Sequence, residues 1–205
     1  MSGDDELTQA LTAAIAGDEA GFALLWRALQ PSVLRYLRVV VGDAAEDVAS
    51  ETWIQAARDL RRFEGDPASF RGWLFRIARN RAIDDRRRVA RRPEEPAESF
   101  DDHVPPAPDT AAEALERSDT AWALELVATL PRDQAEAVML RVVAGLDVAA
   151  TAQVLGKRPG AVRVATMRGL RKLAALPQVQ ARNGLMDRLR GEVGRPPGHP
   201  RPGEV

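Results

Sequence analysis

Apolar residues recur at every third or fourth position along most of the chain, and the two-residue alternation typical of strands is nearly absent. This spacing gathers apolar side chains on one face of a helix, so the sequence predicts an all-α fold. Pro31 is expected to start a new helical segment, and Gly42 with Asp43 to separate that segment from a long helix after it. The residues at helix spacing in this half are Phe22, Leu25, Trp26 and Leu29 before Pro31, Val33, Leu34, Leu37 and Val41 after it, and Val48, Thr52 or Trp53, Ala56 and Leu60 on one face of the long helix.

A loop is predicted at residues 63–67, where the turn-forming residues Gly65, Asp66 and Pro67 stand together. A further apolar stripe follows the loop and runs into an arginine-rich segment at 86–92. This stripe consists of Phe70, Trp73, Leu74, Ile77 and Ala78, of which Trp73, Leu74 and Ile77 are interpreted as core because of their helical spacing.

Residues 93–110 hold five prolines and six acidic residues, with few large apolar ones. Such a composition cannot bury enough apolar surface to fold, so it predicts an extended linker. The sequence therefore predicts two small helical domains, at residues 1–92 and 111–176, joined by an acidic, proline-rich linker. A C-terminal extension at 177–205 becomes rich in Pro and Gly and is expected to be largely disordered.

The last two predicted helices form a helix-turn-helix motif. Asp147 is expected to cap a short helix at 148–155, Gly156 to end it, and Pro159 to open a longer helix that runs to about residue 175. In this motif the second helix lies in the major groove of duplex DNA. Its predicted inward residues are Val162, Thr166, Leu170 and Leu173, and its candidate DNA contacts are Arg158, Arg163, Val164, Met167, Arg168 and Arg171.

The small net charge of −1 hides two basic blocks. Residues 58–92 carry a net charge of +7 and residues 141–176 a net charge of +6, whereas residues 93–140 between them carry −10. Clustered arginine is the pattern expected for contact with phosphate groups, although a solvated helix face can also carry such a run.

The first basic block also holds four of the ten aromatic residues of the chain. Unpaired bases stack on aromatic rings while guanidinium groups hold the phosphates, so this block predicts a site for single-stranded DNA. The candidate contacts are Phe63, Arg76, Arg79, Asn80, Arg86, Arg87 and Arg88.

Composition excludes several kinds of chemistry. The chain has no cysteine, which excludes disulfides and thiolate metal sites, and no metal or cofactor is predicted. His103 and His199 lie in proline-rich segments and are interpreted as solvated, while Asp84 and Asp85 are expected to form ion pairs with nearby arginines. No apolar run approaches the roughly 20 residues that span a membrane, and the acidic N-terminus lacks the order of a signal peptide, so a cytoplasmic protein is expected.

Two sets of motifs resemble the sigma-70 family of bacterial RNA polymerase sigma factors, specifically its extracytoplasmic-function (ECF) group. The first set, which the family carries in its region 2, consists here of Asp47, Val48, Glu51, Thr52, Trp53, Phe63, Gly65, Trp73, Leu74, Ile77, Ala78, Asn80, Asp84 and Arg87. The second set, in region 4, consists of Leu130, Pro131, Gly145, Leu146, Leu155, Gly156, Gly160, Ala161, Val162 and Arg163. The chain departs from the family pattern at Ser50, at residues 149–151, and at Val164 and Ala165, which stand where Ser-Arg is typical.

The resemblance implies a protein without enzymatic activity that directs core RNA polymerase to promoters. Region 2, at residues 1–92, would bind the clamp helices of the polymerase through Asp47, Glu51 and Trp53, and would melt and hold the minus-10 element. Region 4, at residues 111–176, would bind the minus-35 element as duplex DNA, together with the polymerase flap. The resemblance also implies an anti-sigma protein as a partner, and no insertion into a membrane.

Two other functions stay open on the residues alone. A conventional regulator would use the helix-turn-helix at 146–176 to recruit or block polymerase, but this function gives the first basic block, at 58–92, no role. An enzyme acting on nucleic acid would need a catalytic centre, and the chain offers no cysteine and only two histidines for one. Tight binding of a specific duplex by the free protein would favour the regulator, and metal-dependent DNA cleavage would favour the enzyme.

Overall fold

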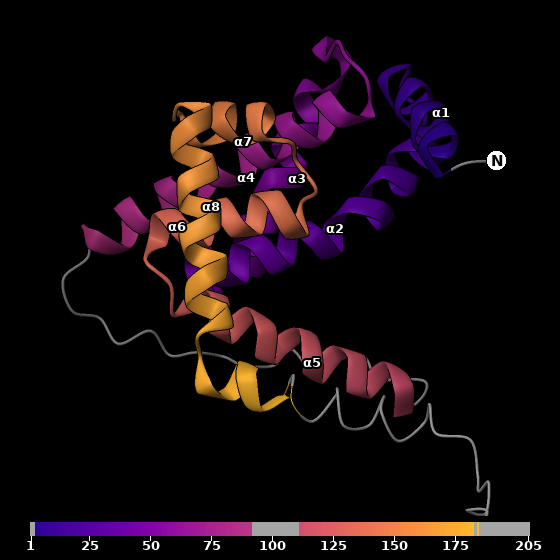
Figure 1. Cartoon of the computed structure of the whole chain (residues 1–205). Helices are drawn as coiled ribbons and strands as arrows, with labels where there is room; N and C mark the ends of the chain where they lie inside the picture. The colour runs from indigo at the N-terminus through magenta and orange to yellow at the C-terminus, as the bar shows by residue number, and fades with distance from the viewer. Residues whose placement is uncertain (1–2, 92–110, 183, 185–205) are drawn as a thin grey trace, which may run out of the picture.

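The computed structural model describes residues 3–91, 111–182 and 184, and this part of the chain is helical, with no strand (Figure 1). The predicted all-α fold is therefore confirmed. The helices are α1 (Gly3–Ile15), α2 (Glu19–Val41), α3 (Ala45–Asp59), α4 (Pro67–Ala90), α5 (Ala111–Ala128), α6 (Arg132–Val138), α7 (Val148–Leu155) and α8 (Pro159–Ala174). Shorter helical turns lie at Gly42–Ala44, Leu60–Arg62 and Met139–Val143. The predicted linker lies outside the described residues.

Helices α1 to α4 pack around one shared core. Asp18 caps α2 by accepting a hydrogen bond from the backbone amide of Gly21 at 2.9 Å. Gly21 also lets α1 approach α2 closely, because a Cβ atom at this position would lie 2.8 Å from the carbonyl oxygen of Ala10. The large, fully buried side chains of this core are Leu25, Val33, Tyr36, Leu37, Val48, Phe70, Leu74 and Phe75.

The prediction that Pro31 starts a new helix is wrong. Helix α2 runs without a break from Glu19 to Val41, and Pro31 lies inside it with its ring exposed. A proline in a helix interior costs about 3 kcal/mol, and the burial of Leu25, Leu29, Val33 and Leu37 along one face of α2 offsets that cost. Packing over a long helix therefore outweighs a local helix-breaking signal.

The loop at the start of α4 forms as predicted. Asp66 caps the helix by accepting a hydrogen bond from the backbone amide of Ser69 at 2.8 Å, and Pro67 occupies a first-turn position. Proline is tolerated there because the first amides of a helix have no intrahelical partner. These two residues set the direction in which α4 leaves the loop.

The predicted helix-turn-helix is present in α7 and α8. Asp147 caps α7 by accepting a hydrogen bond from the backbone amide of Ala150 at 2.7 Å. Gly156 ends α7 in a left-handed conformation, with a φ of 63°, and Pro159 opens α8. Glycine suits this turn because other residues are strained at positive φ.

Helix α8 packs on α6 through a face that differs slightly from the predicted one. Its buried residues are Val162, Ala165 and Gly169. A Cβ atom at position 169 would lie 2.8 Å from Cγ2 of Val138, so the glycine allows the two helices to touch. Leu170 was expected to face inward, but it is 44% exposed, because Gly169 occupies the contact with α6.

The beginning of the C-terminal extension is helical, and the rest of the extension, apart from residue 184, lies outside the described residues. Residues 177–182 form a short helical segment. Arg182 pairs with Asp119 of α5 at 2.6 Å, and its guanidinium carbon lies 4.7 Å from the centre of the Trp122 ring. These contacts hold the segment against α5. The short helix that the sequence allows around Leu185 lies outside the described residues.

The N-terminal and C-terminal helices lie against each other. Helix α4 contacts α7, and α2 contacts both α5 and α6. Figure 1 shows α8 crossing α6, with α7 at one end of it and α5 at the other. The candidate surface for single-stranded DNA on α4 is therefore next to the helix-turn-helix.

Candidate nucleic-acid interface

The solvent side of α8 brings together all six residues that the sequence analysis selected as duplex contacts. The two apolar members are well exposed, Val164 at 41% and Met167 at 46%. The arginines surround them on the same helix and are also exposed; they are Arg158, Arg163, Arg168 and Arg171. A helix with this surface can meet phosphates through its cations and base edges through its first turns.

The departure from the family pattern at Ala165 has a structural explanation. Ala165 is only 6% exposed and belongs to the core of the C-terminal helices. A long arginine side chain would not fit this position without displacing the side chains packed around it. Val164, by contrast, faces solvent, so this departure changes the DNA-facing surface itself.

An aromatic cluster forms the second candidate surface, at the loop before α4. The ring centre of Phe63 lies 5.5 Å from that of Phe70 and 5.3 Å from that of Trp73. Phe70 is buried, whereas Phe63 and Trp73 are half-buried and keep part of each ring accessible.

Hydrogen bonds from the side chain and the backbone of Ser69 hold the pKa of nearby Asp66 below its usual value.

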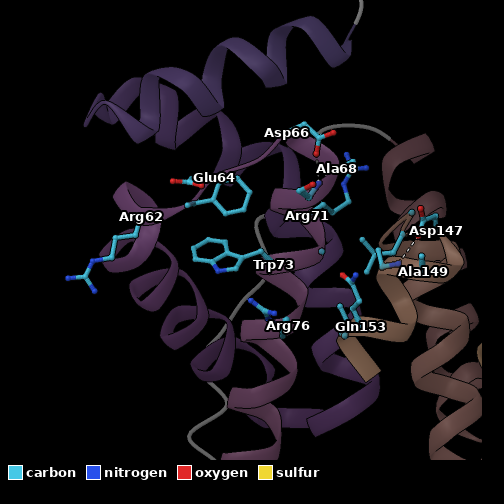
Figure 2. Close-up of a pocket in the computed structure, with 17 residues that line it drawn as sticks. Arg62, Glu64, Asp66, Ala68, Arg71, Trp73, Arg76, Asp147, Ala149 and Gln153 are labelled. Atoms are coloured by element: carbon cyan, nitrogen blue, oxygen red, sulfur yellow. Dashed lines mark hydrogen bonds between the residues drawn. The ribbon is translucent and has the colours of Figure 1, made fainter. Parts of the chain in front are cut away.

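A cavity of 710 Å³ separates this cluster from α7. Figure 2 shows Trp73 and Arg76 of α4 on one side of it, and Ala149 and Gln153 of α7 on the other. Arg76 is exposed, as is Asn80 one turn further along α4. The two residues are therefore placed to reach DNA that enters along α4.

Arg79 points toward α6 instead of toward open solvent. Its Nε donates a hydrogen bond to Glu136 at 2.9 Å, and Nε of Arg132 donates another to the same carboxylate at 2.7 Å. Glu136 is only 3% exposed. Burial alone would raise the pKa of Glu136, but the hydrogen bonds and charges of the two arginines outweigh it, and the pKa lies below its usual value.

Sequence reasoning missed Glu136, which joins the two halves of the molecule. Arg132 and Glu136 stand four residues apart, and that spacing is visible in the sequence. The partner that matters for the fold, Arg79, is 57 residues away and carries no local signal of this contact. In this arrangement Arg79 is committed to an ion pair and not to DNA.

The three arginines at the end of α4 differ in their surroundings. Arg86 is half-buried and donates from Nε to the carbonyl oxygen of Ala82, and burial lowers its pKa. Arg87 and Arg88 are exposed. They pair with Asp84 at 3.9 Å and with Asp85 at 2.6 Å, so both ion pairs expected from the sequence are present.

Helix α3 carries the predicted polymerase contacts, and one of them needs correction. Asp47 and Glu51 are exposed. Trp53 is 6% exposed, its ring packs edge-on against Phe22, and its Nε1 donates a hydrogen bond to Gln30 at 2.6 Å. Its indole is therefore part of the core, because its one polar group is satisfied internally. The accessible apolar side chain on this helix is Ile54.

The described residues hold no group of three or more His, Cys, Asp or Glu side chains that could bind a metal ion. His103 and His199 lie outside the described part of the chain. No helix within that part is both long enough and apolar enough to cross a membrane.

Two basic surfaces, one on a helix-turn-helix and one beside partly accessible aromatic rings, are the candidate DNA-binding regions of the class of proteins that this fold indicates. Residues 25–92 match the family Sigma-70 region 2, and residues 120–173 match Sigma-70, region 4. The chain is 36% identical over 189 residues to the ECF RNA polymerase sigma factor ShbA of Streptomyces griseus, which covers 85% of this chain and 98% of ShbA. It is 31% identical over 175 residues to the ECF RNA polymerase sigma factor SigD of Mycobacterium tuberculosis, with 82% of each chain covered.

Solved structures share the fold. The structure of CnrH in complex with the cytosolic domain of CnrY superposes with a TM-score of 0.57 at 23% identity, over 83% of this chain and 96% of that chain. The chain therefore belongs to the ECF group of the sigma-70 family, the RNA polymerase sigma factors. It is a promoter-directing factor of transcription initiation, in a family of non-catalytic initiation factors.

Proposed function

We propose that the two surfaces read two promoter elements in different states. Helix α8 binds the minus-35 element as intact duplex, and the surface around Phe63, Arg76 and Asn80 holds unpaired bases of the minus-10 element. The observation that carries this proposal is the exposed basic face of α8, which lies on a capped helix-turn-helix. The half-buried rings of Phe63 and Trp73, close to exposed Arg76, support the second part.

Binding to core RNA polymerase is assigned to both regions. Asp47 and Glu51 on the exposed side of α3 are proposed to contact the clamp helices, and region 4 to contact the flap. Exposed Ile54 adds an apolar contact between these two acidic residues and the end of α3. Such a mixture of charged and apolar side chains suits a protein interface. The protein would act where the polymerase does, in the cytoplasm.

The two regions are proposed to separate when promoter DNA is bound. Helix α7 lines the same cavity as Trp73 and Arg76. The side chain of Arg79 is hydrogen-bonded to Glu136. DNA held along α4 would compete with both contacts. The packed arrangement described above is therefore assigned to the protein without DNA.

An anti-sigma protein is a further proposed partner. CnrH was solved with the cytosolic domain of CnrY, and RpoE from Bartonella quintana with the anti-sigma factor NepR, which superposes here with a TM-score of 0.55 at 21% identity. A partner that holds the two regions together would keep the DNA surfaces of this chain covered. Co-purification of a partner that blocks run-off transcription would support this assignment.

Run-off transcription with core polymerase on a promoter library tests the proposed function. Addition of the full chain is expected to produce transcripts from a defined set of promoters, while the free chain binds the same duplexes weakly. Tight and specific binding by the free chain, without stimulation of transcription, would identify a conventional regulator. Failure to associate with core polymerase would refute the proposal.

A further inference from the structure

An apolar strip lies on the outermost face of α8, where a DNA-reading helix usually carries polar groups. Val164 and Met167 are 41% and 46% exposed, while Val162 and Ala165 on the opposite side are buried. A helix turns by about 100° per residue, so the two exposed side chains project about 60° apart, away from the core. Neither of them belongs to the apolar residues packed against the core.

Their neighbours on α8 are cations that bracket the strip. Arg163 and Arg168 are exposed on its two sides, and Arg171 follows one turn further along. Cations placed this way can hold the two phosphate backbones that border a groove. The side chains between them would then face the floor of the groove, where the base edges lie.

Leu170 is exposed as well and lies beside the strip. It lines a shallow apolar groove with Val148, Thr166 and Met167, on the side of α8 that faces α7. Met167 therefore borders both this groove and the outer face of α8. Val164 does not line the groove, so the groove does not account for its exposure.

The chemistry of the strip limits what it can recognise. Valine and methionine side chains offer no hydrogen-bond donor, and only the methionine sulfur is a weak acceptor. They cannot form the paired hydrogen bonds by which arginine reads guanine or asparagine reads adenine. The apolar group exposed in the major groove is the C5-methyl of thymine.

We infer that Val164 and Met167 are specificity-determining residues that read thymine methyl groups in the upstream promoter element. This inference rests on the proposed function, in which α8 lies in the major groove. It adds the chemical identity of the recognised bases. Arg163, Arg168 and Arg171 then supply affinity through phosphates, and the strip supplies selection for thymine at the positions that it touches.

Replacement of thymine by uracil tests the inference, because it deletes only the methyl group. The holoenzyme, formed from core polymerase and the full chain, is first used to select promoters from a library. Each thymine of the selected upstream element is then replaced singly by deoxyuridine, and promoter binding is measured. Wild-type holoenzyme is expected to bind about fourfold more weakly for each contacted methyl that is lost, the factor that corresponds to burying one methylene-sized group.

The variants Val164→Ala and Met167→Ala should each abolish the difference between thymine and uracil at one position. Arg168→Ala is expected to weaken binding to both templates equally, since a phosphate contact does not sense the methyl group. Val142→Ala is the matched apolar control, because Val142 is 61% exposed and lies outside α8. It should behave as the wild type on both templates.

Three results would overturn the inference. These are a selected element without a preferred thymine, equal binding of uracil and thymine templates by the wild-type holoenzyme, and a wild-type ratio in both alanine variants. A holoenzyme that transcribes but ignores uracil would overturn this inference and leave the proposed function standing. Absence of any polymerase-dependent promoter binding would overturn both.

Discussion

At the scale of single residues, exposure separates side chains that can meet DNA from those that hold the fold. Asn80 and Arg76 are exposed on α4, whereas Arg79 between them is tied to Glu136. Trp53 shows the same distinction on α3, because its indole nitrogen is satisfied by Gln30 and its ring is buried. Residue type alone does not separate these cases.

Asn80→Ala is expected to impair strand opening more than initial promoter binding. Its exposed amide can hydrogen-bond to bases or backbone that become accessible along α4, and one such bond contributes about 0.5–1.5 kcal/mol. Permanganate reactivity of unpaired thymines should therefore fall by roughly two- to tenfold. Arg168→Ala is the contrasting variant and should weaken the initial duplex complex. Equal effects of Asn80→Ala on both steps would contradict a role in strand separation.

Glu136 predicts a loss of stability in acid. Its pKa in the folded protein lies below its usual value of 4.5 because burial, which acts in the opposite direction, is outweighed by Arg79 and Arg132. Ionised Glu136 therefore stabilises the fold above about pH 4.5, and this contribution disappears as the pH falls through the folded-state pKa. Glu136→Gln should lower the free energy of unfolding at neutral pH by about 1–3 kcal/mol.

Urea unfolding over a series of pH values from neutral into the acid range measures this effect. The deficit of Glu136→Gln relative to wild type should shrink as the pH falls through the folded-state pKa, because the wild-type carboxylate then takes up a proton. Glu125→Gln, on the exposed side of α5, is the matched control and should change little. A deficit that stays constant with pH would show that packing, and not charge, accounts for it.

At the scale of elements, the close contact between α6 and α8 positions α8, which is proposed to read DNA. Gly169 permits this contact, and Gly160 at the other end of α8 has no atom within 4 Å of a Cβ placed there. The local caps define where α7 and α8 begin, but the glycine determines how deeply α8 sits on α6. The exposure of Val164 and Met167 depends on that depth.

Gly169→Ala is expected to destabilise the protein although alanine favours helices. The added Cβ would lie 2.8 Å from Val138 and 3.3 Å from Leu130, and overpacking of this kind costs about 1–3 kcal/mol. Gly160→Ala adds the same atom to the same helix in open space, so it should be neutral or stabilise by up to about 1 kcal/mol. Thermal or urea unfolding of the pair measures the difference. Equal stability of the two variants would show that α6 and α8 are not in close contact.

At the scale of the whole molecule, the two regions hide parts of each other. The contact of α4 with α7 and the ion pair between Arg79 and Glu136 join halves that are proposed to bind two promoter elements. A protein whose binding surfaces are partly covered binds its target more weakly, in proportion to the fraction that is open. The packed state is therefore expected to weaken promoter binding by the free chain.

A disulfide between α4 and α7 should lock the regions together. A Cβ at position 72 would lie 3.8 Å from Cβ of Ala150, a separation typical of disulfides at about 3.8 Å, and the chain has no other cysteine. The double variant Gly72→Cys/Ala150→Cys is expected to lose most run-off transcription when oxidised and to regain it after reduction. The two single variants are the controls. Full activity of the oxidised double variant would show that the regions need not separate.

The sequence by itself determined the helical class, the loop before α4, and the caps and glycine turn of the helix-turn-helix. These features depend on a few neighbouring residues, such as Asp66 with Pro67 or Asp147 with Gly156. It also identified the residues on the outer side of α8 except Leu170, because helical periodicity is a local property. It failed at Pro31, where burial along the whole of α2 outweighs one unfavourable residue.

The tertiary structure alone decided which of these residues are accessible and which are paired. The contact between Arg79 and Glu136, the close approach of α8 at Gly169, and the cavity shared by α4 and α7 each join residues far apart in sequence. Such contacts depend on how complete helices pack, and packing is decided by the shapes of both partners together. The residues around a helix end determine where the helix stops. A surface shared by two helices forms only after both helices have packed together.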